Sequence, residues 1–120
     1  MKQEEKELLL RDLFGRLPYG AFVQFEVDGQ KTIKPLTVDF LSSTWYHTEW
    51  IKPYLRPMSS MTEEEKFEYD RILSIEHEGY LLIEEVPDII DFYNSKHLDY
   101  RGLIPMGLAL EAPEDLYKTE

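Results

Sequence analysis

The sequence predicts an α+β fold in which an N-terminal helix precedes a small antiparallel β-meander, and two or three helices follow. Three features predict this order: a leucine-rich amphipathic start, an alternating apolar run that ends in Asp-Gly, and a helix-capping sequence near the middle. A meander that curls on itself would be a small SH3-like barrel. With 120 residues, of which 42% are hydrophobic, the chain is expected to form one domain with its own core.

The first predicted element is an amphipathic helix over residues 3–17. Its apolar stripe follows the i, i+3, i+4, i+7 spacing through Leu10, Leu13, Phe14 and Leu17, with Leu9 beside it. A proline and a glycine follow this stretch and end the helix there.

A β-hairpin is predicted next. Residues 21–28 alternate between apolar and polar side chains, which is typical of a half-buried strand. Asp28 and Gly29 favour a tight turn, because both residue types tolerate positive φ. The return strand covers residues 30–36, and Pro35 places it at a sheet edge or ends it.

The rest of the first half is predicted to continue the meander. A third strand covers residues 36–40, a turn follows at residues 42–44, and Trp45 and Tyr46 begin a fourth short strand. Residues 51–58 contain two prolines and are predicted to be irregular.

The second half is predicted to be helical. Thr62 and Glu65 have the spacing of a capping box, so a helix begins near Glu63. It is expected to bury Phe67 with some of four further side chains: Tyr69, Ile72, Leu73 and Ile75. Another helix is expected over residues 88–97, with three apolar side chains on one side: Ile89, Phe92 and Tyr93.

Shorter pieces complete this half. The apolar run at residues 80–83 is either a strand or an extended connection. Asp99 caps a short helical turn, and Leu108 and Leu110 dock as a last extended piece. Residues from 112 onward are expected to fray.

The net charge of −11 comes from one part of the chain. Residues 1–60 hold eight Lys or Arg and eight Asp or Glu, whereas residues 61–120 hold five and sixteen. The chain therefore divides into a sheet-containing half, 1–57, and an acidic helical half, 58–120. Direct nucleic-acid binding is not expected, since it needs clustered Lys and Arg. An acidic half favours basic protein surfaces, or serves solubility alone.

Several classes of site and location have no signature in the sequence. There is no cysteine, no apolar run near the ~18 residues of a membrane span and no basic, apolar signal sequence, so we expect a cytoplasmic protein without membrane association. The three histidines, His47, His77 and His97, are scattered, and no glycine-rich phosphate loop or nucleophile motif occurs. No cofactor, metal ion or catalytic residue is predicted.

Two groups of residues are candidates for binding. Four large aromatic residues fall within ten positions, and they either form an exposed anchor for a partner or close the core: Trp45, Tyr46, Trp50 and Tyr54. Arg56 lies beside them. In the second group, Asp99, Tyr100 and Arg101, the arginine either meets an anionic group or ties Asp99 or the acidic third helix to the fold.

Three blocks of sequence resemble one family. PYLRPMSSMTEEE (residues 53–65), DYRGLIPMGLALEAPE (residues 99–114) and the opening ELLLRDLFGRLPYG (residues 7–20) are similar to blocks in small uncharacterised proteins of gut anaerobic bacteria and their prophages. The blocks cover a little over a third of the chain. This resemblance implies an origin and supplies no activity or site residues.

The sequence favours a non-enzymatic protein-interaction or accessory protein, with a prophage or other mobile element as its source. One alternative is an acidic nucleic-acid mimic that occupies the basic cleft of a DNA-binding protein, which needs exposed carboxylates spaced like phosphates. Another is a small hydrolase or transferase, which needs His97, Tyr100 and Arg101 to converge on a pocket. The protein partner and the oligomeric state stay open.

Overall fold

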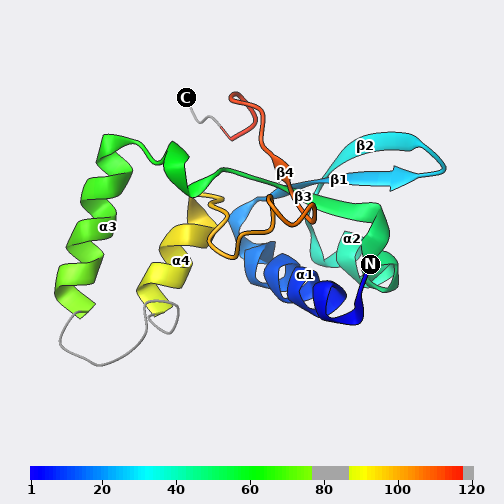
Figure 1. Ribbon diagram of the computed structural model, residues 1–120, viewed down its shortest axis with the longest axis horizontal. Helices are drawn as coiled ribbons and strands as arrows, with labels where there is room; N and C mark the ends of the chain where they lie inside the picture. The colour runs from blue at the N-terminus through cyan, green and yellow to red at the C-terminus, as the bar shows by residue number, and fades with distance from the viewer. Residues whose placement is uncertain (77–86, 118–120) are drawn as a thin grey trace.

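The computed structural model describes residues 1–76 and 87–117 (Figure 1). The helix α1 (Gln3–Arg16) and a short 3-10 turn, η1 (Leu17–Tyr19), precede a four-stranded sheet, and two helices, α3 (Glu63–Glu76) and α4 (Pro87–Ser95), lie beyond it. The α+β prediction is confirmed. The apolar run predicted at residues 80–83 lies outside the described residues.

The buried face of α1 is shifted by one residue from the predicted stripe. Its members keep the i, i+3, i+4, i+7 spacing, but they are Leu9, Asp12, Leu13 and Arg16. Phe14, predicted to be inside, is 56% exposed. The predicted stripe was chosen from apolar residues alone. It missed the buried face because half of that face consists of the Asp12 carboxylate and the Arg16 guanidinium.

The predicted hairpin is confirmed. β1 (Phe22–Val27) pairs with β2 (Gln30–Pro35) in antiparallel register, and the turn residues Asp28 and Gly29 have φ of 53° and 81°. Positive φ at both central positions matches the twist of the flanking strands. β2 is an edge strand, as Pro35 predicts, since the sheet order is β2-β1-β3-β4.

The predicted third and fourth strands are wrong. α2 (Val38–Thr44) and a 3-10 segment, η2 (Trp45–Trp50), occupy this part of the chain. Thr37 starts α2 by accepting a hydrogen bond from the Phe40 backbone N–H at 3.1 Å. The serine and threonine hydroxyls of the predicted turn donate instead to helix carbonyls one turn earlier.

The segment predicted to be irregular contains a central strand. β3 (Ile51–Leu55) pairs antiparallel with β1 and parallel with β4 (Leu110–Glu111), and a 3-10 turn, η3 (Met58–Ser60), follows it. Pro53 lies opposite Val23 of β1, one residue before the first β3–β4 pair, Tyr54 with Leu110. The described strands lie in an open order with edges at β2 and β4, so the SH3-like barrel is not formed.

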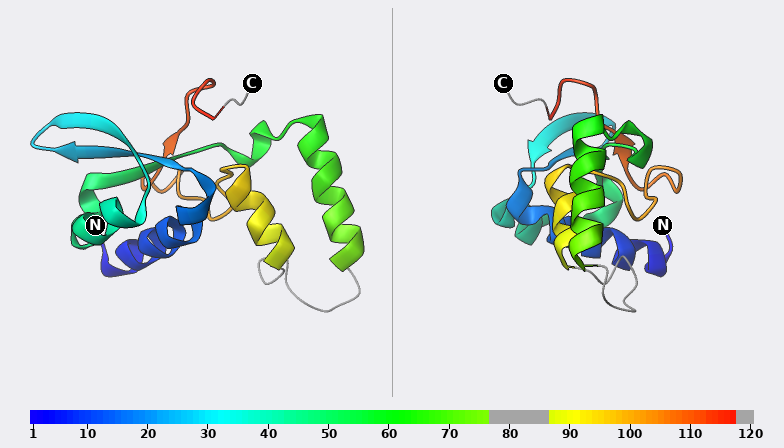
Figure 2. Two further views of the ribbon diagram at one scale, coloured as in Figure 1. Left: turned by 180° about the vertical axis from the view of Figure 1, so that it is seen from behind. Right: turned by 90° about the vertical axis from the view of Figure 1, so that its left-hand side faces the viewer.

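Two apolar clusters fill the interior of an elongated molecule of 49 × 34 × 26 Å. The larger joins α1, the sheet and α2 with Leu103, Leu108 and Ala109. The smaller lies between α3 and α4, which stand side by side at one end of the molecule (Figures 1 and 2). The predicted burial of Ile89, Phe92 and Tyr93 in this cluster is confirmed: all three are buried.

α3 begins at the predicted residue, but one side chain that was predicted to be buried in it is exposed. Thr62 and Glu65 form the capping box, with the Glu65 N–H donating to Thr62 Oγ1 at 3.2 Å and the Thr62 N–H donating to Glu65 Oε1 at 2.9 Å. Phe67 points away from the core and is 74% exposed. Tyr69 and Ile72, which were also predicted to face the core, pack against α4 as expected. In the described part of the chain no helix is long and apolar enough to cross a membrane.

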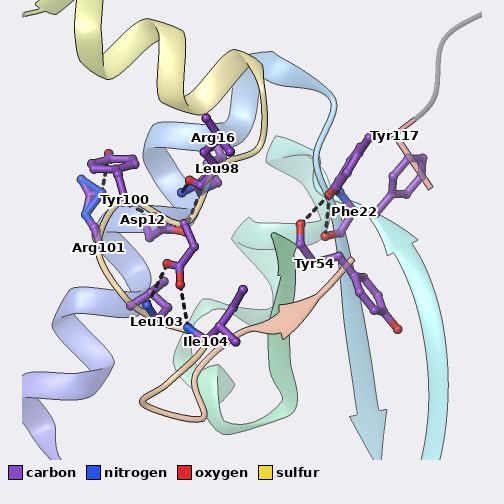
Figure 3. A network of polar contacts seen from close by, with 11 residues as sticks. Asp12, Arg16, Phe22, Tyr54, Leu98, Tyr100, Arg101, Leu103, Ile104 and Tyr117 are labelled. Atoms are coloured by element: carbon purple, nitrogen blue, oxygen red, sulfur yellow. Dashed lines mark hydrogen bonds and ion pairs between the residues drawn. The ribbon is translucent and has the colours of Figure 1, made fainter. Parts of the chain in front are cut away.

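A buried polar network joins the two clusters (Figure 3). Arg16 Nε donates to Asp12 Oδ2 at 2.8 Å, and Arg16 Nη2 donates to the Leu98 carbonyl at 2.7 Å. Both side chains of the ion pair are fully buried. Arg101 Nη1 adds a longer contact, 3.4 Å, to the second Asp12 oxygen.

Residues 112–117 are anchored to the sheet, contrary to the fraying predicted from residue 112 onward, whereas residues 118–120 lie outside the described residues. The Tyr117 hydroxyl accepts a hydrogen bond from the Phe22 N–H at 2.8 Å and donates to the Tyr54 carbonyl at 2.8 Å, so it bridges β1 and β3 (Figure 3). Its ring stacks on His97 with centroids 3.7 Å apart.

Two glycines, one in the hairpin turn and one in α1, are predicted to respond in opposite ways to substitution by alanine. Gly29→Ala should destabilise the protein by about 1 kcal/mol, because a side chain at φ +81° is strained. Gly15→Ala, in the last turn of α1, should stabilise it by about 0.5 kcal/mol, since the added Cβ meets only Asn94 Nδ2 at 3.8 Å. Urea unfolding measures the change in the free energy of unfolding for each variant. Changes of the same sign would contradict the difference in backbone conformation between the two positions.

The buried ion pair predicts strong non-additivity. Asp12→Leu should lower the free energy of unfolding by about 3–5 kcal/mol, because it leaves the Arg16 guanidinium buried without its counter-ion. Adding Arg16→Met should recover part of that loss, since the unpaired charge is then gone. Urea unfolding of both single variants and the double variant gives the coupling. A double variant as unstable as the two single losses combined would show that the charges are not coupled.

Candidate functional site

The four predicted aromatic residues divide between surface and core. Trp45 and Tyr46 are 51% and 59% exposed, and their rings meet edge to face with centroids 5.9 Å apart. Trp50 is half-buried, and Tyr54 is buried in β3. Both interpretations of the sequence therefore hold for part of the group: the first pair faces solvent and the second closes the core.

A chain of ring contacts supports the exposed pair from behind. Tyr46 lies 4.5 Å from the His47 ring, and His47 stacks on Trp50 at 3.7 Å with an interplanar angle of 14°. Trp50 then meets Phe25 of β1 edge to face at 6.0 Å. The exposed rings are thus fixed to the sheet through successive aromatic contacts, each of which restrains their motion.

One residue of this surface was missed by the sequence analysis. Val38 is 68% exposed on α2, and Ser42 and Trp45 follow it at i+4 and i+7, on the same side of the helix. The Trp45 backbone N–H still bonds to the Leu41 carbonyl, so the helical register extends to it. Residues 36–40 were predicted to be a strand, in which Val38 would share a face with Leu36 and Phe40.

The N-terminal residue adjoins this surface. Thr48 Oγ1 donates to Met1 Sδ at 3.8 Å, which places the half-exposed Met1 side chain against η2. We call the four exposed apolar side chains the aromatic face: Met1, Val38, Trp45 and Tyr46.

Arg56, the next predicted site residue, is committed to the fold. Its guanidinium makes two parallel bonds to the Glu65 carboxylate, at 2.8 and 2.7 Å, and donates to the Ser60 and Lys96 carbonyls. This ion pair lowers the pKa of Glu65 to about 2 and raises the pKa of Arg56. Arg56 therefore links the end of β3 to the start of α3 and to the exit from α4.

The group from Asp99 to Arg101 also has structural roles. The Asp99 carboxylate accepts hydrogen bonds from the Leu103 and Ile104 N–H groups at 2.7 and 2.9 Å, which confirms the predicted turn cap (Figure 3). Arg101 binds neither Asp99 nor an open surface: its guanidinium lies over the Tyr100 ring and contacts Asp12. The partner of Arg101 lies 89 positions away in the chain, so sequence spacing could not reveal it.

A groove of about 740 Å³ lies between η3, the start of α3, the exit from α4 and the C-terminal tail, and His97 is in its wall. Burial and the charges of Arg16 and Arg56 lower the pKa of His97 to about 4, so the imidazole is neutral at pH 7. The nearby hydroxyls cap local turns: Ser60 Oγ donates to the Pro57 carbonyl and Ser95 Oγ donates to the Phe92 carbonyl.

The groove does not gather the residues that the enzyme alternative needs. His97 faces the groove and stacks on Tyr117, whereas Tyr100 stacks on Tyr93 and Arg101 contacts Asp12. Tyr100 and Arg101 thus contact each other, but His97 lies apart from them in the groove, and this arrangement gives a hydrolase or transferase site no support. Across residues 1–76 and 87–117, no three His, Asp or Glu side chains are grouped as metal ligands.

Five carboxylates of the acidic half make contacts with other groups of the described chain. Glu65 pairs with Arg56, and Asp99 caps a turn. Contacts to Lys66, Lys96 and Tyr19 engage three more carboxylates: Glu63, Glu68 and Asp91. The nucleic-acid mimic needs exposed and regularly spaced charges, and these contacts do not favour it.

The pKa shift of Glu65 predicts a pH-dependent stability. The folded pKa of about 2 lies below the ordinary value of 4.5, so the stabilisation is present above pH 4.5 and lost between about pH 4.5 and 2. Glu65→Gln, which keeps a capping side chain, should therefore lower the free energy of unfolding at pH 7 by about 1–2 kcal/mol. The difference from wild type should shrink as the pH falls.

The matched control for this experiment is Glu64→Gln, because Glu64 is an exposed carboxylate in the same helical turn. Its loss should not exceed about 0.5 kcal/mol. Urea unfolding between pH 7 and pH 2.5 compares both variants with wild type. Equal effects of the two substitutions would show that the ion pair with Arg56 contributes nothing specific.

No protein-family model, curated protein or solved structure matches the chain. Its function must therefore be inferred from its own residues and contacts.

Proposed function

We propose that the protein is a non-enzymatic interaction protein that binds a protein partner through its aromatic face. The observation that carries this proposal is the exposed pair Trp45 and Tyr46, held on a helix end and supported from behind by stacked rings. Tryptophan and tyrosine are the residues most enriched among those that dominate binding energy at protein interfaces.

The geometry of the pair is suited to binding. An anchor that is already fixed loses little conformational entropy when a partner covers it. The stack of His47 on Trp50, at 3.7 Å, restrains the segment before any partner arrives. By contrast, Arg56 beside the groove is engaged in four internal hydrogen bonds.

The biological setting belongs to the same proposal. The resemblance of residues 53–65 and 99–114 to proteins of gut anaerobic bacteria and their prophages supports an accessory role on a mobile element. Neither block contains the aromatic face. The resemblance therefore bears on origin and the face bears on binding.

The proposal predicts which substitutions remove binding without unfolding the protein. The double variant Trp45→Ala/Tyr46→Ala should lose about 30-fold or more in affinity for a captured partner, the effect of removing a dominant anchor. Its urea midpoint should stay close to that of wild type, because both side chains are half-exposed. Affinity capture from a lysate of the encoding organism, in 0.15 M and 1 M NaCl, measures the loss.

The matched control is Phe67→Ala, which removes an exposed aromatic side chain from α3, at the other end of the molecule. It should capture the same partner as wild type. Retention should survive 1 M NaCl, since an apolar contact is not screened. Capture that is unchanged in the double variant, or lost in the control, would refute binding through the aromatic face.

A further inference from the structure

We infer that the partner of the aromatic face is a second copy of this chain, so that two molecules form a two-fold symmetric dimer through α2 and η2. This inference rests on the proposed function, because it names the partner of the same surface. Two-fold symmetry lets one patch meet itself, and it is the commonest arrangement among soluble oligomers.

The distribution of charge favours this partner. The aromatic face lies in residues 1–60, where eight Lys or Arg balance eight Asp or Glu. The acidic helices α3 and α4 lie at the opposite end of the long axis, away from α2 (Figures 1 and 2). A dimer through the aromatic face would place the two acidic ends far apart, at several times the ~8 Å screening length of physiological salt. The net charge of −11 therefore does not oppose this mode of association.

The same distribution disfavours a basic partner at this position. A basic surface would be attracted to the acidic end, where α3 carries three glutamates in its first turn. The aromatic face instead presents four exposed apolar side chains, from a half of the sequence in which basic and acidic residues are equal in number. Its best complement is another apolar, charge-balanced surface, and a second copy presents that surface at equal concentration.

The exposed area is sufficient for a weak, specific dimer. Half-exposed aromatic side chains leave roughly 100 Å² each in water, and with Val38 and Met1 the face offers about 400 Å² of apolar surface. Two copies would cover about 800 Å², and the polar rim would bring the interface to the lower end of the specific class, near ~1,200 Å². Because buried area alone does not set affinity, an interface at this lower end of the size range is expected to be a weak one.

The shape of the surface also allows self-packing. Val38, Ser42 and Trp45 form a short ridge at i, i+4 and i+7, and such a ridge can pack beside the same ridge of another helix. The small Ser42 lies between the two large side chains and leaves room for an incoming one. Trp45 of each copy can then cover Val38 of the other.

Sedimentation equilibrium of the whole chain, from about 1 to 200 µM, tests the inference. Wild type should shift with concentration from 14.3 kDa toward twice that mass. Trp45→Ala/Tyr46→Ala and Val38→Lys should each raise the dissociation constant about 30-fold or more, whereas Phe67→Ala should leave it unchanged. The dimer should persist in 1 M NaCl, since its contact is apolar.

Three results would overturn the inference: a wild-type protein that stays at 14.3 kDa at 200 µM, a dimer insensitive to all three face substitutions, or a dimer that dissociates in 1 M NaCl. Far-UV circular dichroism and urea unfolding confirm that each variant is folded. A monomeric wild type that still captures a partner through Trp45 and Tyr46 would reject the second copy and leave the proposed function in place. Loss of both behaviours would reject both.

Discussion

The rest of the structure depends on the hydrogen bonds that the buried guanidinium of Arg16 makes. It joins α1 to the chain after α4, because it binds Asp12 and the Leu98 carbonyl together. The segment around Leu98 in turn pairs with β3, through the Arg56 N–H to the His97 carbonyl at 2.7 Å and the Asp99 N–H to the Arg56 carbonyl at 2.8 Å. A buried charge must keep its partners, so this one side chain fixes how the helical end meets the sheet.

That arrangement determines where binding can occur. The polar side chains near the junction of the two apolar clusters hold the fold together: Arg56 binds Glu65, and Arg101 contacts Asp12. Tyr117, which lines the groove, joins β1 to β3 through its hydroxyl. Groups so engaged have little capacity for a ligand, since a new contact must first replace an existing one. The exposed rings of Trp45 and Tyr46, at the other end of the molecule, do not join parts of the fold in this way.

Local signals in the sequence predicted local structure, and long-range contacts escaped it. The hairpin turn at Asp28 and the capping box at Thr62 each depend on residues within four positions, and both were predicted. The frame of α1 was missed because Asp12 and Arg16 are buried only through contact with residues 98–101. The start of α2 was read as a strand because residues 36–40 alternate in polarity as a strand does, and only the cap at Thr37 marks the helix. For the candidate site, the sequence identified Trp45 and Tyr46 but could not say which aromatics would face outward.

The burial pattern of η2 indicates that stability alone does not explain the outward orientation of Trp45 and Tyr46. Thr48 is almost wholly buried in the same segment in which Trp45 and Tyr46 are half-exposed. Folding for stability alone favours the reverse, because burying an aromatic ring removes far more apolar surface from water than burying a threonine. Trp50, from the same segment, is held between His47 and Phe25, so the fold can accommodate such a ring. A local conflict between polarity and burial is expected where a surface serves binding, and here it coincides with the residues that carry the proposed interface.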